Sequence, residues 1–245
     1  MLDLHAMTAG FWGPPTSSVD WCEADYQVTP YVAEFWNTLS SLALVVAGTL
    51  GLWLNRVLPR RFLAAYGLLA VVGLGSMAFH ATLRFELQML DELPMLYLVT
   101  LIVYLLVEHG PVRRLGAWFP WGLVGYDVFL TILCSGSRGR LQFWLFQLSF
   151  GSLEVWSLWR VSLSFRRSEN LAQRRLFRFG MSAYLLGIAV WFCDLQFCAQ
   201  LGTWLPLHGI PNPQLHAWWH VLVACGFYAL VLFIARDRAV IAAAP

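Results

Sequence analysis

Seven long apolar segments constrain this chain more than any other feature of its sequence. They cover roughly residues 34–54, 62–83, 88–107, 117–134, 141–163, 179–199 and 214–234. An α-helix needs about 20 mainly apolar residues to cross a bilayer, and each segment is close to this length. Only 12% of the 245 residues are charged, whereas a soluble domain carries about 25%. The sequence therefore predicts an all-α membrane protein built as a bundle of seven transmembrane helices.

The connections between these segments are short and leave no room for a second folded unit. We expect an N-terminal segment over residues 1–33, the seven-helix bundle over 34–238 and a short tail over 239–245. The first thirty residues lack the basic start and the continuous apolar core of a signal peptide. The first span is therefore expected to insert as its own signal.

Arginines are distributed unevenly over the connections. Twelve follow the first, third, fifth and seventh spans, and three lie in the opposite connections. Because basic residues are enriched in cytosolic loops, this asymmetry predicts a luminal N-terminus and a cytosolic C-terminus. The net charge of +2 does not indicate nucleic-acid binding, since the arginines occupy the loops in which this topology requires them.

Four ionisable residues lie in the apolar segments, and all four are expected at the same depth in the membrane. His80 ends the second span, Asp91 begins the third, and His216 and His220 lie four residues apart at the start of the seventh. An ionisable side chain costs roughly 2.5–3.5 kcal/mol at the centre of a membrane helix, so such residues usually face one another, water or a metal. Histidine and carboxylate are zinc ligands, and the sequence predicts a metal site here. For any single histidine, a hydrogen bond between helices is the alternative.

Acidic residues cluster before the first span. Four of the fourteen acids lie within fifteen positions, and no basic residue occurs in the first 55. These acids are Asp20, Glu23, Asp25 and Glu34. Oxygen-rich clusters bind calcium, although the spacing is not that of an EF-hand. A solvated acidic loop is the alternative interpretation.

Two cysteines and three further acids complete the set of polar residues. Cys22 and Cys198 both fall on the expected luminal side, where disulfides are permitted. Asp127, Glu154 and Asp194 lie inside spans. These three acids either line a cavity or pair with Arg160 or with backbone, and the sequence does not assign them.

Three stretches of the chain resemble the alkaline ceramidases, a family of seven-pass membrane hydrolases. They run from Phe11 to Asn37, from Val72 to Pro94 and from Gln214 to His220, and they contain the patterns GS-x3-H, LDELP and H-x3-H. The resemblance implies hydrolysis of the amide bond of ceramide lipids, with a sphingoid base and a fatty acid as products. It also implies location in the endoplasmic reticulum or Golgi membrane. No obligate protein partner is evident.

The resemblance implies a catalytic zinc held by His80, Asp91 and the pair His216 and His220 through a water. Ser76, one helix turn before His80 on the same face, lies nearby in this interpretation. We expect Asp91 to carry the proton from the attacking water to the leaving amine. We expect Ser76 to donate a hydrogen bond to the oxyanion.

The same resemblance implies a calcium site before the first span and a disulfide. The calcium ligands are Asp20, the carbonyl of Trp21, Glu23, Asp25 and Glu34. The family more often has asparagine at the position of Asp25, a difference that keeps an oxygen ligand and adds charge. The implied disulfide joins Cys22 to Cys198.

Two other functions compete with hydrolysis. Receptors of the adiponectin and progestin type have a similar seven-pass fold with a bound zinc, but they have the metal and the N-terminus on the cytosolic side and lack the acidic segment. The arginine distribution therefore argues against a receptor. A transporter with a structural metal is the third possibility, but the sequence has no symmetric pair of broken helices.

Overall fold

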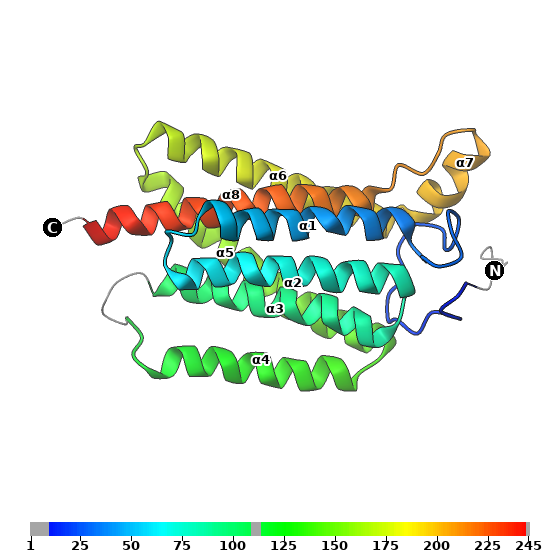
Figure 1. Cartoon of the computed structure of the whole chain (residues 1–245), viewed down its shortest axis with the longest axis horizontal. Helices are drawn as coiled ribbons and strands as arrows, with labels where there is room; N and C mark the ends of the chain where they lie inside the picture. Colours follow the sequence, from blue (N-terminus) through cyan, green and yellow to red (C-terminus); the bar gives the residue numbers. More distant parts are fainter. Residues whose placement is uncertain (1–9, 109–113, 244–245) are drawn as a thin grey trace.

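The computed structural model describes residues 10–108 and 114–243, and its regular structure in these ranges is helical. The helices are α1 (Phe35–Leu54), α2 (Arg60–Thr82), α3 (Phe85–Val107), α4 (Trp118–Gly136), α5 (Gly139–Arg167), α6 (Leu171–Gln196), a π-helical turn η1 (Gln200–Trp204), α7 (Leu205–Leu207) and α8 (Leu215–Ala243). The long helices run side by side along the long axis of the molecule (Figure 1). The predicted all-α bundle is confirmed.

Six of the helices are long and apolar enough to cross a membrane. They are α1, α2, α3, α4, α6 and the part of α8 from Leu215 to Asp237. The protein is therefore a multi-pass integral membrane protein. Helix α5 has 29 residues, but polar side chains such as Gln142, Glu154 and Arg160 lower its mean hydropathy. The seventh span remains a prediction.

The N-terminal segment and the last turns of α8 lie at opposite ends of the long axis (Figure 1). An odd number of crossings requires this arrangement, while the orientation in the membrane remains a prediction. Helix α8 continues to Ala243, through most of the range expected as a tail. Residues 1–9 and 244–245, which belong to the expected N-terminal segment and tail, lie outside the described residues.

Glycines let the helices approach closely where the polar residues lie. A Cβ on Gly75 of α2 would lie 2.0 Å from the carbonyl oxygen of Leu90 on α3. A Cβ on Gly48 of α1 would lie 2.5 Å from the backbone nitrogen of Ala70 on α2. Small residues allow such backbone contact in membrane bundles. The contact at Gly75 brings the following residue, Ser76, beside Asp91.

The N-terminal segment crosses the end of the bundle and covers the turn between α2 and α3. The amides of Thr16 and Ser17 donate to the carbonyl of Leu83, at 3.0 and 3.1 Å. The amide of Glu34 donates to the carbonyl of His80 at 2.9 Å. This backbone contact puts the Glu34 side chain next to the His80 ring.

A cavity of about 350 Å³ lies inside the bundle, with walls from α1, α2, α3, α5, α6 and α8. Most of its lining is apolar. The exceptions at one end include Ser76, Asp91, His216 and His220. The cavity therefore extends from these four polar residues into the apolar interior of the bundle.

Candidate metal centre

Three histidines meet at the end of the bundle that carries the N-terminal segment. His80 comes from the last turn of α2, and His216 and His220 come from the first turns of α8. The ring centroids lie 4.8 to 5.2 Å apart. One ring nitrogen from each lies within 4.8 Å of the other two. The three side chains are at most 4% exposed, so they converge in a space closed to solvent.

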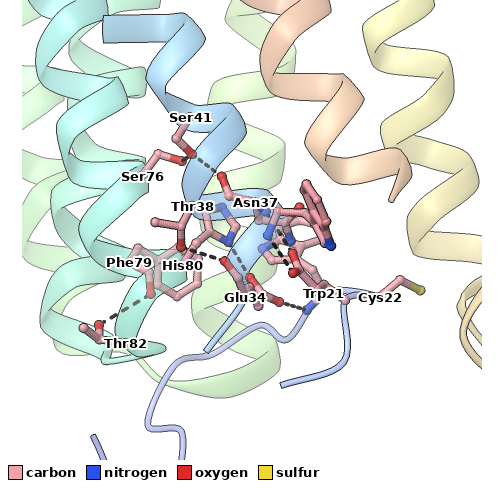
Figure 2. A network of polar contacts seen from close by, with 12 residues as sticks. Trp21, Cys22, Glu34, Asn37, Thr38, Ser41, Ser76, Phe79, His80 and Thr82 are labelled. Atoms are coloured by element: carbon pink, nitrogen blue, oxygen red, sulfur yellow. Dashed lines mark hydrogen bonds and ion pairs between the residues drawn. The ribbon is translucent and has the colours of Figure 1, made fainter. Parts of the chain in front are cut away.

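The hydrogen bonds of the histidines leave one nitrogen of each ring for a metal. Nδ1 of His80 donates to Oε2 of Glu34 (Figure 2), and its Nε2 is buried without a partner among the described residues. Nδ1 of His220 lies 2.8 Å from Oγ of Ser40, and its Nε2 has only a longer contact, 3.5 Å, with Oγ of Ser76. Nδ1 of His216 is buried and also unpartnered. A carboxylate on the far nitrogen of a histidine is typical of zinc sites, so these residues fit a metal ion.

Aromatic stacking orients the His216 ring. The indole of Trp21 stacks on it with 3.9 Å between ring centroids and 24° between planes. The backbone amide of Trp21 donates to Oε1 of Glu34 at 3.2 Å (Figure 2). Trp21 was predicted as a carbonyl ligand for calcium, and the contact of its ring with His216 was missed.

Ser76 lies between the histidines and Asp91. Its Oγ is 3.0 Å from Oγ of Ser41 (Figure 2) and 3.5 Å from Nε2 of His220. It also shares a side-chain hydrogen bond with Asp91. Asp91 is 9% exposed and does not belong to the group formed by the three histidine nitrogens. The structure thus brings Asp91 to Ser76, and direct ligation by Asp91 remains a prediction.

The acidic residues before α1 divide into two groups. Carboxylate oxygens of Asp20, Asp25 and Glu34 lie within 4.8 Å of one another. The carboxylate of Glu23 instead accepts hydrogen bonds from the amides of Trp36 and Asn37, at 2.7 and 2.8 Å. Burial raises the pKa of Glu23 to about 7, although these two amides lower it.

Glu23 therefore satisfies the free amides in the first turn of α1. Only three of the four predicted acidic ligands form one compact group. Within this group, Glu34 is also the residue that pairs with His80.

One disulfide and two hydrogen bonds fasten the N-terminal segment to the C-terminal part of the chain. Cys22 and Cys198 form a disulfide with their Cα atoms 5.2 Å apart. The amide of Cys22 lies 3.4 Å from Oδ2 of Asp194, and Nδ2 of Asn212 donates to its carbonyl at 2.8 Å. Of the unassigned acids, Asp194 thus pairs with backbone, and Asp127 accepts a hydrogen bond from Thr100. Glu154 lines the cavity.

Sequence reasoning missed the partners of the histidines on α1. Glu34 pairs with His80, and Ser40 and Ser41 contact His220. The signal was present in the spacing, because Glu34, Asn37 and Ser41 recur at the interval of one helix face. All three are 0% exposed, so this face of α1 is a polar stripe turned into the bundle.

Comparison with known proteins gives a consistent result over almost the whole chain. Residues 13–243 match the Ceramidase family. The chain is 36% identical over 236 residues to alkaline ceramidase 3 of Mus musculus, covering 94% of this chain and 86% of that protein. It is 30% identical to an alkaline ceramidase of Arabidopsis thaliana, covering 94% and 88%. It is 28% identical to alkaline ceramidase 1 of Homo sapiens, covering 91% and 83%.

These matches span the N-terminal segment, the three histidines and all the long helices. They agree with the resemblance that the GS-x3-H, LDELP and H-x3-H patterns indicate. They favour a hydrolase over a receptor or a transporter. This chain belongs to the ceramidase family of membrane hydrolases.

Proposed function

We propose that this protein hydrolyses the amide bond of ceramides and releases a sphingoid base and a fatty acid. The observation that carries the proposal is the set of three buried histidines whose ring nitrogens converge at one end of an apolar cavity. Membership of the ceramidase family supports the same reaction. The apolar lining suits two alkyl chains, and the polar end suits the amide that joins them.

We infer that the metal is zinc. Nε2 of His80, Nδ1 of His216 and Nε2 of His220 would hold it, with Asp91 as a fourth group directly or through water. When bound, zinc polarises a carbonyl and lowers the pKa of a bound water to about 7. Glu34 keeps the His80 proton on Nδ1, so that Nε2 stays available.

The remaining steps use side chains of this protein. Asp91 takes the proton of the attacking water on its carboxylate and delivers it to the nitrogen of the leaving amine. Ser76 donates from Oγ to the carbonyl oxygen as negative charge develops there. The apolar wall around them excludes water and strengthens both interactions.

We also propose that calcium binds to the acidic group of Asp20, Asp25 and Glu34, with the carbonyl of Trp21. The mutual approach of three carboxylates within 4.8 Å supports this, because calcium takes six to eight oxygen ligands. The role is to brace the N-terminal segment against the histidines. The proposed location is the endoplasmic reticulum or Golgi membrane, and the Cys22–Cys198 disulfide supports an oxidising compartment on that side.

Incubation of the purified protein with N-stearoylsphingosine tests the reaction. We expect sphingosine and stearic acid to appear in equal amounts, and His220→Ala to abolish both while the variant retains cooperative thermal unfolding. His208→Ala is the matched control, because His208 is exposed and bonds to the carbonyl of Trp204. Absence of either product from the wild type, or unchanged turnover in His220→Ala, contradicts the proposal.

A further inference from the structure

The cavity contains a second polar position, far from the histidines. Phe150, Glu154, Ser157 and Val161 of α5 all line it, at the spacing of one helix face. Gln142, near the start of α5, hydrogen-bonds with Glu92, the neighbour of Asp91, and so marks the level of the metal centre. Glu154 is twelve residues further along α5, or about 18 Å at 1.5 Å per residue. It thus lies where an alkyl chain would run.

Two groups at this position have unused hydrogen-bonding capacity. Oε1 of Glu154 is buried and has no hydrogen-bond partner among the described residues. The same is true of Oγ of Ser157, and Ser157 is 7% exposed. Serines in helices usually return their hydroxyl to a backbone carbonyl. Ser152 and Ser162 of the same helix do so, at 3.1 and 2.8 Å. Ser157 differs from both and lines the cavity instead.

Tyr184 of α6 completes the polar position. It is 7% exposed, lines the cavity and lies beside the carboxylate of Glu154. Helix α6 packs mainly against α8, and α5 mainly against α3. The pair therefore does not lie in a tightly packed interface of α5 with α6, where it would serve only to join two helices. Tyr184 orients Glu154, and the unpartnered Oε1 is left to the cavity.

We propose that Glu154, Ser157 and Tyr184 form a binding site for a hydroxyl group carried by an alkyl chain of the lipid substrate. The hydroxyl donates to Oε1 of Glu154 and accepts from Oγ of Ser157, which satisfies both groups at once. An alkyl chain without a hydroxyl leaves both side chains without a hydrogen-bond partner in an apolar cavity, which costs free energy. The inference rests on the proposed function, because it assigns the cavity to a ceramide. The hydroxyl belongs either to the acyl chain or to the sphingoid chain.

Hydrolysis of two series of synthetic ceramides tests the site. In one series the hydroxyl moves along the stearoyl chain from the carbon next to the amide toward the methyl end. In the other it moves along the sphingoid chain. We expect kcat/KM to peak at one mid-chain position, about tenfold or more above N-stearoylsphingosine. The series that shows the peak identifies the chain. Equal kcat/KM for every member of both series overturns the site.

Variants connect the preference to the named residues. The preference is the ratio of kcat/KM for the best hydroxylated ceramide to kcat/KM for N-stearoylsphingosine. Glu154→Met and Ser157→Ala should each reduce this ratio to near one. Ser152→Ala and Asp127→Asn are the matched controls, because these residues do not line the cavity, and both should keep the preference. A preference that survives in Glu154→Met and Ser157→Ala alike overturns the assignment.

A binding measurement separates this site from the reaction. One member of a series of hydroxystearic acids, or of sphingosines hydroxylated along the chain, should raise the melting temperature of the wild type more than stearic acid or sphingosine does. In Ser157→Ala the hydroxylated and the plain lipid should act equally. If no ceramide is hydrolysed but this difference holds, the proposed function fails and the site stands. If ceramides are hydrolysed but all members of both series act as the plain lipids do, the site fails alone.

Discussion

Glu34 contacts both candidate ion sites through one carboxylate. Oε2 accepts the Nδ1 proton of His80, and Oε1 accepts the amide of Trp21. The same carboxylate lies within 4.8 Å of the acidic oxygens of Asp20 and Asp25. A hydrogen-bonded carboxylate makes a histidine a better ligand. The charge of Glu34 should therefore affect the affinity for both ions.

Glu34→Gln should weaken zinc binding by about 10–100-fold, because it removes the charge behind His80. The measurement is competition with a zinc-chelating dye in calcium-free buffer. Asp25→Asn is the matched variant, since it removes a charge from the acidic group without touching a histidine. It should reduce the rise in melting temperature that calcium produces and leave zinc affinity unchanged. Wild-type zinc affinity in Glu34→Gln would contradict this role.

Ser76→Ala should separate turnover from metal binding. Removal of an oxyanion donor typically costs about 2.7–4 kcal/mol, or roughly 10²–10³ in kcat. Zinc content should stay at the wild-type level, because the histidine nitrogens are untouched. Parallel assays of kcat and bound zinc test this, with Ser152→Ala as control. A variant that loses zinc, or one that turns over at the wild-type rate, refutes the assigned role.

The positions of the histidines followed from the sequence, but most of their partners did not. Span order and helix direction bring His80, His216 and His220 to one depth, which local sequence is enough to predict. Which side of α1 faces them depends on helix packing, such as the close approach of α1 and α2 at Gly48. The pairing of Glu34 with His80 is therefore a tertiary feature. Glu23, predicted as a calcium ligand, accepts hydrogen bonds from two amides in the first turn of α1, and its ligation of calcium remains a prediction.

At the scale of elements, the N-terminal segment covers the three histidines. It contributes the Trp21 ring that stacks on His216 and the backbone contact that positions Glu34. The disulfide from Cys22 to Cys198 ties it to the chain 176 residues later. The conformation of this segment, and with it the geometry of the histidines, should depend on the disulfide.

Cys198→Ser should lower the free energy of unfolding, by up to about 5 kcal/mol according to chain-entropy models for a loop of this length. Unfolding in mixed detergent and SDS micelles measures the change. Cys193→Ser is the control, since Cys193 is a free thiol, and it should have a much smaller effect. Identical unfolding of Cys198→Ser and the wild type would mean that the bridge does not hold the segment.

The sequence predicted seven spans, and six helices of the structure have the length and hydropathy of a span, whereas α5 does not. Two polar residues of α5 face the interior, where Gln142 bonds to Glu92 and Glu154 borders the cavity. A hydropathy average cannot distinguish a polar residue that faces the cavity from one that faces lipid. The sequence for this reason identified Glu154 as an intramembrane acid without assigning it a partner.

At the scale of the whole molecule, the bundle joins a polar centre to a long apolar cavity. Close backbone contact at Gly75 brings Ser76 against Asp91, and α8 supplies the histidines that border the same space. The lining then changes to apolar side chains for most of its length. This arrangement presents the amide of a lipid to the histidines and its chains to the apolar wall.

Titration of zinc into chelator-treated protein tests the central claim most directly. Hydrolysis of N-stearoylsphingosine and bound zinc are measured on the same samples. The account predicts that the rate rises in proportion to bound zinc and stops at one equivalent, and that His216→Ala neither binds that equivalent nor recovers the rate. Full hydrolysis by metal-free protein, or one tightly bound zinc in His216→Ala with restored turnover, would contradict it.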